Sequence, residues 1–193
     1  MKKALQAALV SLALMAYQGV ARADDMDDNE KPKNPHAHLD LGIFVGSITY
    51  DNVVDADNGP LFGVRAGYDF CLHWGVEFVA AWSQSNRTSV AATNRDHEIV
   101  AVDLQYNLRF DGDQRVVPYV GVGVGAWQES TSRTSDQNEL LYHGVVGVRF
   151  RVNKHVAIMV DLREWFVPYY NPYAGKNDQA NCESAQLHFL YRF

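Results

Sequence analysis

The last ten residues of the chain alternate between two kinds of side chain. One set is apolar and ends in an aromatic residue at the carboxy terminus: Ala185, Leu187, Phe189, Tyr191 and Phe193. The other set is mostly polar and includes Ser184, Gln186, His188 and Arg192. Successive side chains of a β-strand point to opposite faces. A strand that is apolar on one face and polar on the other suits a barrel surrounded by lipid and filled with polar groups.

The same alternation recurs in seven earlier segments. Together with the closing segment, they cover approximately residues 38–50, 60–70, 73–83, 97–110, 116–127, 140–151, 154–166 and 183–193. One face of each segment is rich in apolar side chains, and the other holds glycines and charged groups. Most segments are close to the ~9–11 residues that a tilted strand needs to cross a bilayer. The sequence therefore predicts an all-β fold, an eight-stranded antiparallel up-and-down transmembrane β-barrel over residues 38–193.

The connections between these segments alternate in length. Three are short, at residues 71–72, 111–115 and 152–153, and four are long and polar, at 51–59, 84–96, 128–139 and 167–182. Barrels of this kind have short periplasmic turns and longer extracellular loops, so both termini are expected in the periplasm. Aromatic belts are expected at both membrane interfaces. The outer belt would hold Trp82, Trp127, Trp165, Tyr169 and Tyr170, and the inner belt Phe70, Trp74, Phe110, Phe150 and Phe193.

The amino terminus has the features of a secretory signal. Two lysines precede an apolar stretch over residues 4–20, and residues 21–23 form a small-x-small cleavage pattern. Residues 1–23 are therefore predicted to be a signal peptide, and the charged, proline-containing residues 24–37 a disordered periplasmic leader. Cleavage lowers the basic count from 17 to 14, against 23 acidic residues. A chain this acidic is not expected to bind nucleic acid, because a phosphate backbone requires a basic face.

The closing segment also carries a family resemblance. Its alternating Phe189, Tyr191 and terminal Phe193 resemble the last strand of bacterial outer-membrane β-barrels, and the eight-segment pattern resembles the small barrels of the OmpA transmembrane-domain and OmpX type. The resemblance implies a Gram-negative outer membrane, and it implies that these three residues are the signal read by the barrel-insertion machinery. It implies a structural, adhesive or envelope-complex role without a cofactor. The implied partners are outer-membrane lipid, the insertion machinery and an envelope protein bound through the extracellular loops or the leader.

The predicted inner faces carry charges that must be paired or hydrated, because an isolated buried ion costs several kcal/mol. If residues 70–72 form the turn after the second segment, Asp69 lies across from His73, and Arg65 lies across from Glu77. We therefore predict an ionic network that plugs the lumen, made of Arg65, Asp69, Glu77, Asp103, Arg109, Arg149, Asp161, Arg163, His188 and Arg192. The alternative is a gate for a narrow ion or small-solute channel, which stable openings enlarged by Arg65→Ala would indicate.

The histidines and cysteines indicate neither a metal site nor a crosslink. His36 and His38 have no third ligand nearby, whereas a zinc site collects three or four ligands. Cys71 follows the second segment and Cys182 precedes the eighth, so they belong to opposite ends of the predicted barrel. Bridged cysteines have Cα atoms within about 7 Å. We therefore expect no metal site and no intramolecular disulfide.

Two polar regions near the predicted outer mouth suggest other activities. Some small outer-membrane barrels are lipid-modifying enzymes, and Ser83, Ser85, His97 and Glu98 have the residue types of a nucleophilic site. Such a site needs serine, histidine and acid in contact, and no G-x-S-x-G motif occurs. The protein is therefore expected not to be an enzyme, with a lipid-modifying enzyme as the alternative. Residues 167–182 are tyrosine-rich, which favours a recognition surface or an extension of the aromatic belt.

Overall fold

The computed structural model describes most of the predicted barrel region. The described residues are 37–51, 56–86, 94–110, 114–131, 134–171 and 176–193. The predicted signal peptide and, apart from Ala37, the predicted leader lie outside them. Within the described part, no helix is long and apolar enough to cross a membrane.

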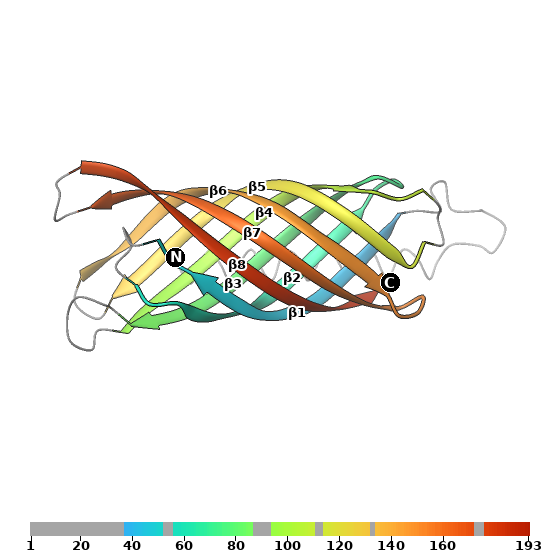
Figure 1. The fold of residues 1–193 in the computed structure, drawn as a ribbon, viewed down its shortest axis with the longest axis horizontal. Coiled ribbons are helices and arrows are strands. Elements are labelled where there is room, and N and C mark those ends of the chain that lie inside the picture. Colours follow the sequence, from blue (N-terminus) through green and yellow to red (C-terminus); the bar gives the residue numbers. More distant parts are fainter. Residues whose placement is uncertain (1–36, 52–55, 87–93, 111–113, 132–133, 172–175) are drawn as a thin grey trace, which may run out of the picture.

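Eight antiparallel strands close into a barrel (Figure 1). Each strand pairs with its neighbours in the sequence, and β1 pairs with β8 to close the sheet. In chain order, the strands are β1 His38–Thr49, β2 Gly59–Asp69, β3 Trp74–Asn86, β4 Asn94–Asn107, β5 Val116–Thr131, β6 Thr134–Arg151, β7 Val156–Asn171 and β8 Lys176–Arg192. The predicted fold class, an eight-stranded antiparallel up-and-down barrel, is confirmed.

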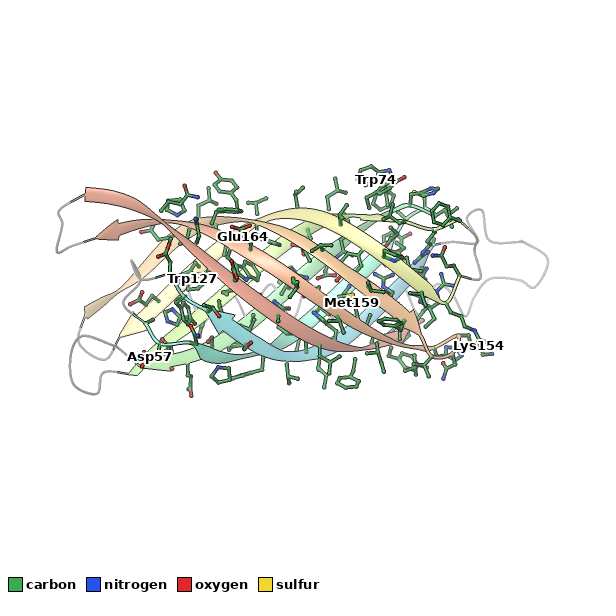
Figure 2. The ribbon with its side chains drawn as sticks, in the orientation of Figure 1. Asp57, Trp74, Trp127, Lys154, Met159 and Glu164 are labelled. Atoms are coloured by element: carbon green, nitrogen blue, oxygen red, sulfur yellow. The ribbon has the colours of Figure 1, made fainter. Side chains whose placement is uncertain are left out.

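The barrel has two ends that differ in their connections. The β2–β3, β4–β5 and β6–β7 connections lie at the same end as Phe193, and this end is called the C-terminal rim. The other connections lie at the opposite rim. Lys154 and Asp57 mark the two ends in Figure 2.

The strands are staggered around the barrel. A path that starts at Leu39 and steps from each residue to its paired residue on the next strand returns to β1 at Thr49. The return point lies ten residues further along β1 than the start. The path runs through Tyr68, Val76, Leu104, Val122, Gly144, Glu164 and Glu183. Strand number and stagger together fix the width of a barrel, and eight strands leave an interior that side chains can fill. The lumen is therefore a packed space.

Alternation along each strand separates an apolar outer face from the lumen. Ile43 is 61% exposed while the next residue, Phe44, is 1% exposed. On β7, Leu162 is 58% exposed while Arg163 is 2% exposed. The apolar stripes predicted from the sequence lie on the outer face, because successive side chains of a strand point to opposite sides.

The strands run further toward the opposite rim than predicted. The predicted 167–182 loop is mostly a hairpin, since β7 continues to Asn171 and β8 begins at Lys176. The pairing of β7 with β6 ends at Phe166, so beyond this point β7 is hydrogen-bonded on one side only. Proline is tolerated where a strand has a free side, which allows Pro168 within β7. The prediction of a long loop here was wrong because β7 and β8 stay paired as far as Asn171 and Lys176.

The register between β2 and β3 also differs from the prediction. Asp69 pairs with Gly75, two residues beyond the predicted partner His73, and Arg65 pairs with Val79. The turn between the two strands is longer than the predicted residues 70–72. It is closed by a hydrogen bond in which the Phe70 amide donates to the Trp74 carbonyl oxygen over 3.1 Å. A shift of two residues leaves every side chain on its predicted face.

Both cysteines are free thiols at different levels of the barrel. Cys71 lies in the β2–β3 connection at the C-terminal rim. Cys182 lies within β8, where it pairs with Trp165 toward the opposite rim. The predicted position of Cys182 before the eighth strand was wrong, but the two cysteines do belong to opposite ends.

The aromatic residues predicted for the inner belt face outward, whereas two of those predicted for the outer belt do not. The exposed members are Phe70, Trp74, Phe110, Phe150 and Phe193. Trp127 and Trp165 are only 4% and 0% exposed and point into the lumen. Trp82 faces outward and stacks on Phe62, with ring centroids 6.4 Å apart. The side chains of Tyr169 and Tyr170 lie outside the described set.

Candidate functional site

The lumen gathers the charged side chains that the inner faces of the strands present. All ten residues predicted for the ionic network point inward; nine are buried and Arg192 is half-buried. Nine of them, together with Asp40, form two charged groups, called here the middle cluster and the rim cluster. The middle cluster contains Arg65, Glu77, Asp103, Asp161 and Arg163, and the rim cluster contains Asp40, Asp69, Arg109, Arg149 and Arg192.

Arg163 is the centre of the middle cluster. Its Nη2 atom lies 2.5 Å from Glu77 Oε1 and 3.3 Å from Asp161 Oδ2, and its Nη1 atom lies 2.7 Å from Asp103 Oδ2. Arg65 makes a second ion pair with Glu77. These residues come from β2, β3, β4 and β7, so the cluster ties together strands that are not all neighbours in the sheet.

Arg65 contacts Glu77 although the two residues do not pair across the ladder. Glu77 pairs with Gly67, one inward position along β2 from Arg65. Diagonal neighbours of this kind lie within reach of long side chains. The predicted contact is therefore present, while the register from which it was derived was wrong.

Two histidines and two neutral groups complete the middle cluster. His143 Nε2 lies 2.7 Å from Asp103 Oδ1, and His188 Nε2 lies 3.1 Å from Asp161 Oδ2. Three carboxylates face two arginines here, and each histidine lies against one of the carboxylates. The Tyr119 hydroxyl donates to Asp161 over 2.9 Å, and the Gln105 amide donates to Glu77 over 2.7 Å.

The rim cluster surrounds two aspartates with arginines at the C-terminal rim. Asp69 Oδ2 accepts from Arg109 Nη2 at 2.6 Å and from Arg149 Nη1 at 3.0 Å. Asp40 accepts from Arg192 Nε at 3.0 Å and lies 3.5 Å from Arg149 Nη1. Two further contacts reach Asp69, from His38 Nε2 at 2.9 Å and Asn107 Nδ2 at 3.2 Å.

Toward the opposite rim, the lumen holds an apolar cluster beside the buried Ser83, Ser85, His97 and Glu129, whereas the sequence predicts polar groups throughout the lumen. The buried residues of the apolar cluster are Phe44, Ile48, Tyr50, Leu61, Val79, Ala81, Ile99, Ala101, Trp127, Leu141, Trp165, Val167, Ala180 and Cys182. Trp127 appears toward this end in Figure 2. Burial raises the pKa of the Tyr50 hydroxyl, which donates to Ser83 Oγ over 2.8 Å. Charged clusters and this apolar cluster together fill the lumen.

Only part of the proposed serine–histidine site comes together. Ser85 Oγ and His97 Nε2 lie 3.0 Å apart. Glu98 does not join them, because it alternates to the outer face and pairs with Trp82, whereas Glu129 is the residue across the ladder from His97. His97 is 0% exposed.

His38 lies beside two carboxylates in a group that has the residue types of a cation site. Its Nε2 atom is 3.8 Å from Asp40 and 2.9 Å from Asp69. His36 lies outside the described residues. The same two carboxylates already contact the guanidinium groups of Arg109, Arg149 and Arg192. A cation there would be repelled by three fixed positive charges, so the geometry does not favour a metal.

Sequence reasoning missed several lumen residues, although the alternation contained the signal. Asp40, Gln105, Tyr119 and His143 occupy inward positions on strands whose outer stripes had been identified. Trp127 directly follows Ala126, whose side chain faces outward, so the alternation places the Trp127 side chain in the lumen. Aromatic type alone favours a belt position for Trp127 and Trp165, whereas their place in the alternation puts both inside.

A closed barrel with an apolar outer face and a filled, charged lumen defines the class of small outer-membrane barrels. The chain belongs to the outer membrane protein β-barrel domain family, whose model matches residues 4–193. No curated protein matches the chain.

Solved structures of the same fold come from several bacteria. Neisserial surface protein A is 17% identical, with 81% of this chain and 96% of that chain covered and a TM-score of 0.55. OprG from Pseudomonas aeruginosa is 18% identical, with coverages of 81% and 95% and a TM-score of 0.56. Ail, the attachment invasion locus protein of Yersinia pestis, is 16% identical, with coverages of 81% and 97% and a TM-score of 0.50. At these identities, the likeness shows the fold.

Proposed function

We propose that this outer-membrane protein is a closed, non-conducting barrel with a structural, adhesive or complex-forming role. The observation that supports it is the filling of the lumen at three levels: the rim cluster, the middle cluster and the apolar cluster. Eight-stranded barrels are filled by side chains, whereas water-filled porins need about 16 strands. A plug of this kind holds strands together that lie apart in the sheet, and so makes the barrel rigid.

The middle cluster argues for a permanent plug over a gate. Arg163 is in contact with three carboxylates, and its side chain is 0% exposed. Removing one partner from a buried ion pair costs about 3–5 kcal/mol. An opening that separated Arg163 from these carboxylates would break several such contacts together. The closed state is therefore the stable one.

The proposed orientation places the C-terminal rim in the periplasm. β5 to β8 have 16–18 residues each, whereas a crossing needs about 9–11. The extra length lies toward the opposite rim and would stand outside the cell, as the longer extracellular parts of such barrels do. Phe189, Tyr191 and Phe193 are 49%, 49% and 52% exposed on the outer face. This exposure suits their proposed recognition by the barrel-insertion machinery.

The protruding strands are the proposed contact surface for an envelope partner, and the barrel is proposed not to be an enzyme. A serine nucleophile needs an accessible histidine as base. His97 is packed between Tyr50 and Trp127, with ring centroids at 4.8 and 5.3 Å. The Ser85–His97 contact therefore serves as a buried hydrogen bond.

Single-channel recording in planar bilayers tests the closed lumen. We expect no stable openings from the folded protein. Arg163→Ala should introduce openings or current noise, because the three carboxylates that lose their arginine would then draw water into the lumen. Leu162→Ala, on the lipid-facing side of the same strand, is the control and should produce no current. Stable, ion-selective openings of the unaltered protein would support the narrow channel instead. Co-purification from native membranes then tests for a stoichiometric partner.

A further inference from the structure

Two carboxylates lie side by side on the outer face of the barrel. Glu164 on β7 pairs with Glu183 on β8 across the ladder, and both side chains are exposed. Among the described residues, neither carboxylate has an ion pair or a hydrogen bond with another side chain. The adjacent Arg163 points into the lumen, and Lys176 begins β8 seven residues from Glu183, roughly 23 Å along the strand. Like charges directly opposite each other on a sheet are destabilising, so this pair calls for a positive group from outside the chain.

The carboxylate pair lies within the lipid-facing band, toward the opposite rim. Glu164 is eight residues from Val156, where β7 begins, which places it roughly 19 Å along the barrel axis at ~3.3 Å per residue and a tilt of ~45°. The apolar band of such barrels is ~25 Å tall. The outward-facing Tyr142 and Phe166 pair with each other still closer to the opposite rim. Ionisable residues at such depths are rare and mark functional sites that have a partner.

An apolar groove adjoins the carboxylate pair on the outer face. The groove crosses β3 to β7 and has a volume of about 660 Å³. Its outward side chains include Val102, Leu104, Val122, Val124, Tyr142 and Phe166. A second hollow, of about 500 Å³, is lined by Glu164 and Glu183. The groove and the hollow share Gly144, where a Cβ would meet nothing within 4 Å. Together they form a depression that is apolar on one side and acidic where β7 meets β8.

We propose that this depression binds a membrane lipid whose headgroup carries a primary amine. One acyl chain would lie in the apolar groove, and the ammonium group would lie against Glu164 and Glu183. An ammonium group donates up to three hydrogen bonds, and charge-assisted bonds of this kind to carboxylates are short and strong. This binding site goes beyond the closed-barrel function, and it holds whichever rim faces the periplasm.

The lining and the depth of the depression favour a lipid as the occupant. Of the described outward side chains in the apolar groove, Tyr142 alone carries a polar group. An acyl chain has no hydrogen bonds to satisfy, so such a lining suits it. The carboxylates lie close to the level at which lipid headgroups begin. The depression therefore presents apolar and charged groups in the order in which a lipid carries its chain and headgroup.

Native mass spectrometry of the folded protein with two matched lipids tests the site. Phosphatidylethanolamine and phosphatidylcholine with identical acyl chains differ only in the methyl groups that replace the ammonium hydrogens. We expect the first phosphatidylethanolamine to bind about tenfold more tightly than the first phosphatidylcholine, because only its ammonium group donates hydrogen bonds to the carboxylates. Glu164→Gln combined with Glu183→Gln should abolish this preference, since the amides keep the size of the side chains and remove their charge.

Two control variants match the acids and the groove. Glu98 faces outward on β4 but lines neither the groove nor the hollow, so Glu98→Gln should leave the preference unchanged. Gly144→Leu places a side chain where the groove and the hollow meet and should weaken the binding of both lipids. Ala66→Leu, on the outer face of β2, should not. All of these substitutions lie on the outer face and leave the lumen unchanged, and the heat-dependent gel mobility of each variant reports folding.

Three results would overturn the proposal. A preference for phosphatidylethanolamine that survives in the Glu164→Gln, Glu183→Gln variant would show that the amine binds elsewhere. Equal affinity of the unaltered protein for both lipids would show that the carboxylates do not select a headgroup, and would leave them to a membrane protein with a basic side chain. Unchanged binding of both lipids by Gly144→Leu would show that the acyl chain does not occupy the groove.

Discussion

Arg163 Nη1 lies 2.7 Å from Asp103 Oδ2 and joins β7 to β4 through the lumen, although the two strands are not neighbours in the sheet. The same guanidinium contacts Glu77 on β3 and Asp161 on its own strand. One side chain therefore connects carboxylates from three strands. The backbone hydrogen bonds of the barrel wall join only adjacent strands, and these ion pairs add a connection across its interior.

Arg163→Met should destabilise the barrel by about 3–5 kcal/mol, because three buried carboxylates lose their shared cation. Reversible urea unfolding in lipid vesicles measures the change. Lys154→Met, at an exposed turn position, should leave the unfolding midpoint unchanged. A midpoint for Arg163→Met equal to that of the parent would show that water already solvates the middle cluster.

Gly123→Ala should cost about 1–3 kcal/mol, because a Cβ at this position would collide with the His143 ring and with Asp103. Gly144→Ala on the outer face is the matched control, since a Cβ there meets nothing within 4 Å. That variant should be neutral or more stable by about 0.4–1 kcal/mol, because alanine loses less backbone entropy on folding. Equal costs for both variants would contradict the close packing around His143.

Tryptophan fluorescence distinguishes the lumen from the lipid face. In vesicles of brominated lipid, single-tryptophan variants that keep Trp74 or Trp82 should be quenched, because these rings face outward. Variants that keep Trp127 or Trp165 should resist quenching, since these rings are 4% and 0% exposed inside the barrel. Strong quenching of Trp165 would mean that β7 presents the opposite face to lipid.

A fluorophosphonate probe should not label Ser85 in the folded protein. The base that would activate it, His97, is 0% exposed and packed against aromatic rings. Mass spectrometry of the probe-treated protein gives the measurement, with Ser83→Ala and Ser85→Ala as paired controls. Labelling that is lost in Ser85→Ala and retained in Ser83→Ala would instead show that Ser85 is reactive. That result would support the alternative that the protein is an enzyme.

Local alternation predicted the wall of the barrel well and its interior contacts poorly. The outward stripe of each strand, the closing aromatic strand and the inward position of Arg163 all follow from a period of two along the chain. The same rule would have placed Trp127 and Trp165 inside. It could not give the β2–β3 register, because a shift of two residues preserves every face. The backbone hydrogen bond from Phe70 to Trp74 decided that register.

The sequence by itself determined which side chains face lipid and which are enclosed, because strand geometry converts adjacent positions into opposite faces. Only the tertiary structure decided which enclosed groups meet. The ten-residue stagger accumulated around the closed sheet brings Asp103, Glu77 and Asp161 to one guanidinium and separates them from the rim cluster. That stagger is a property of the whole ring, so no single strand contains it.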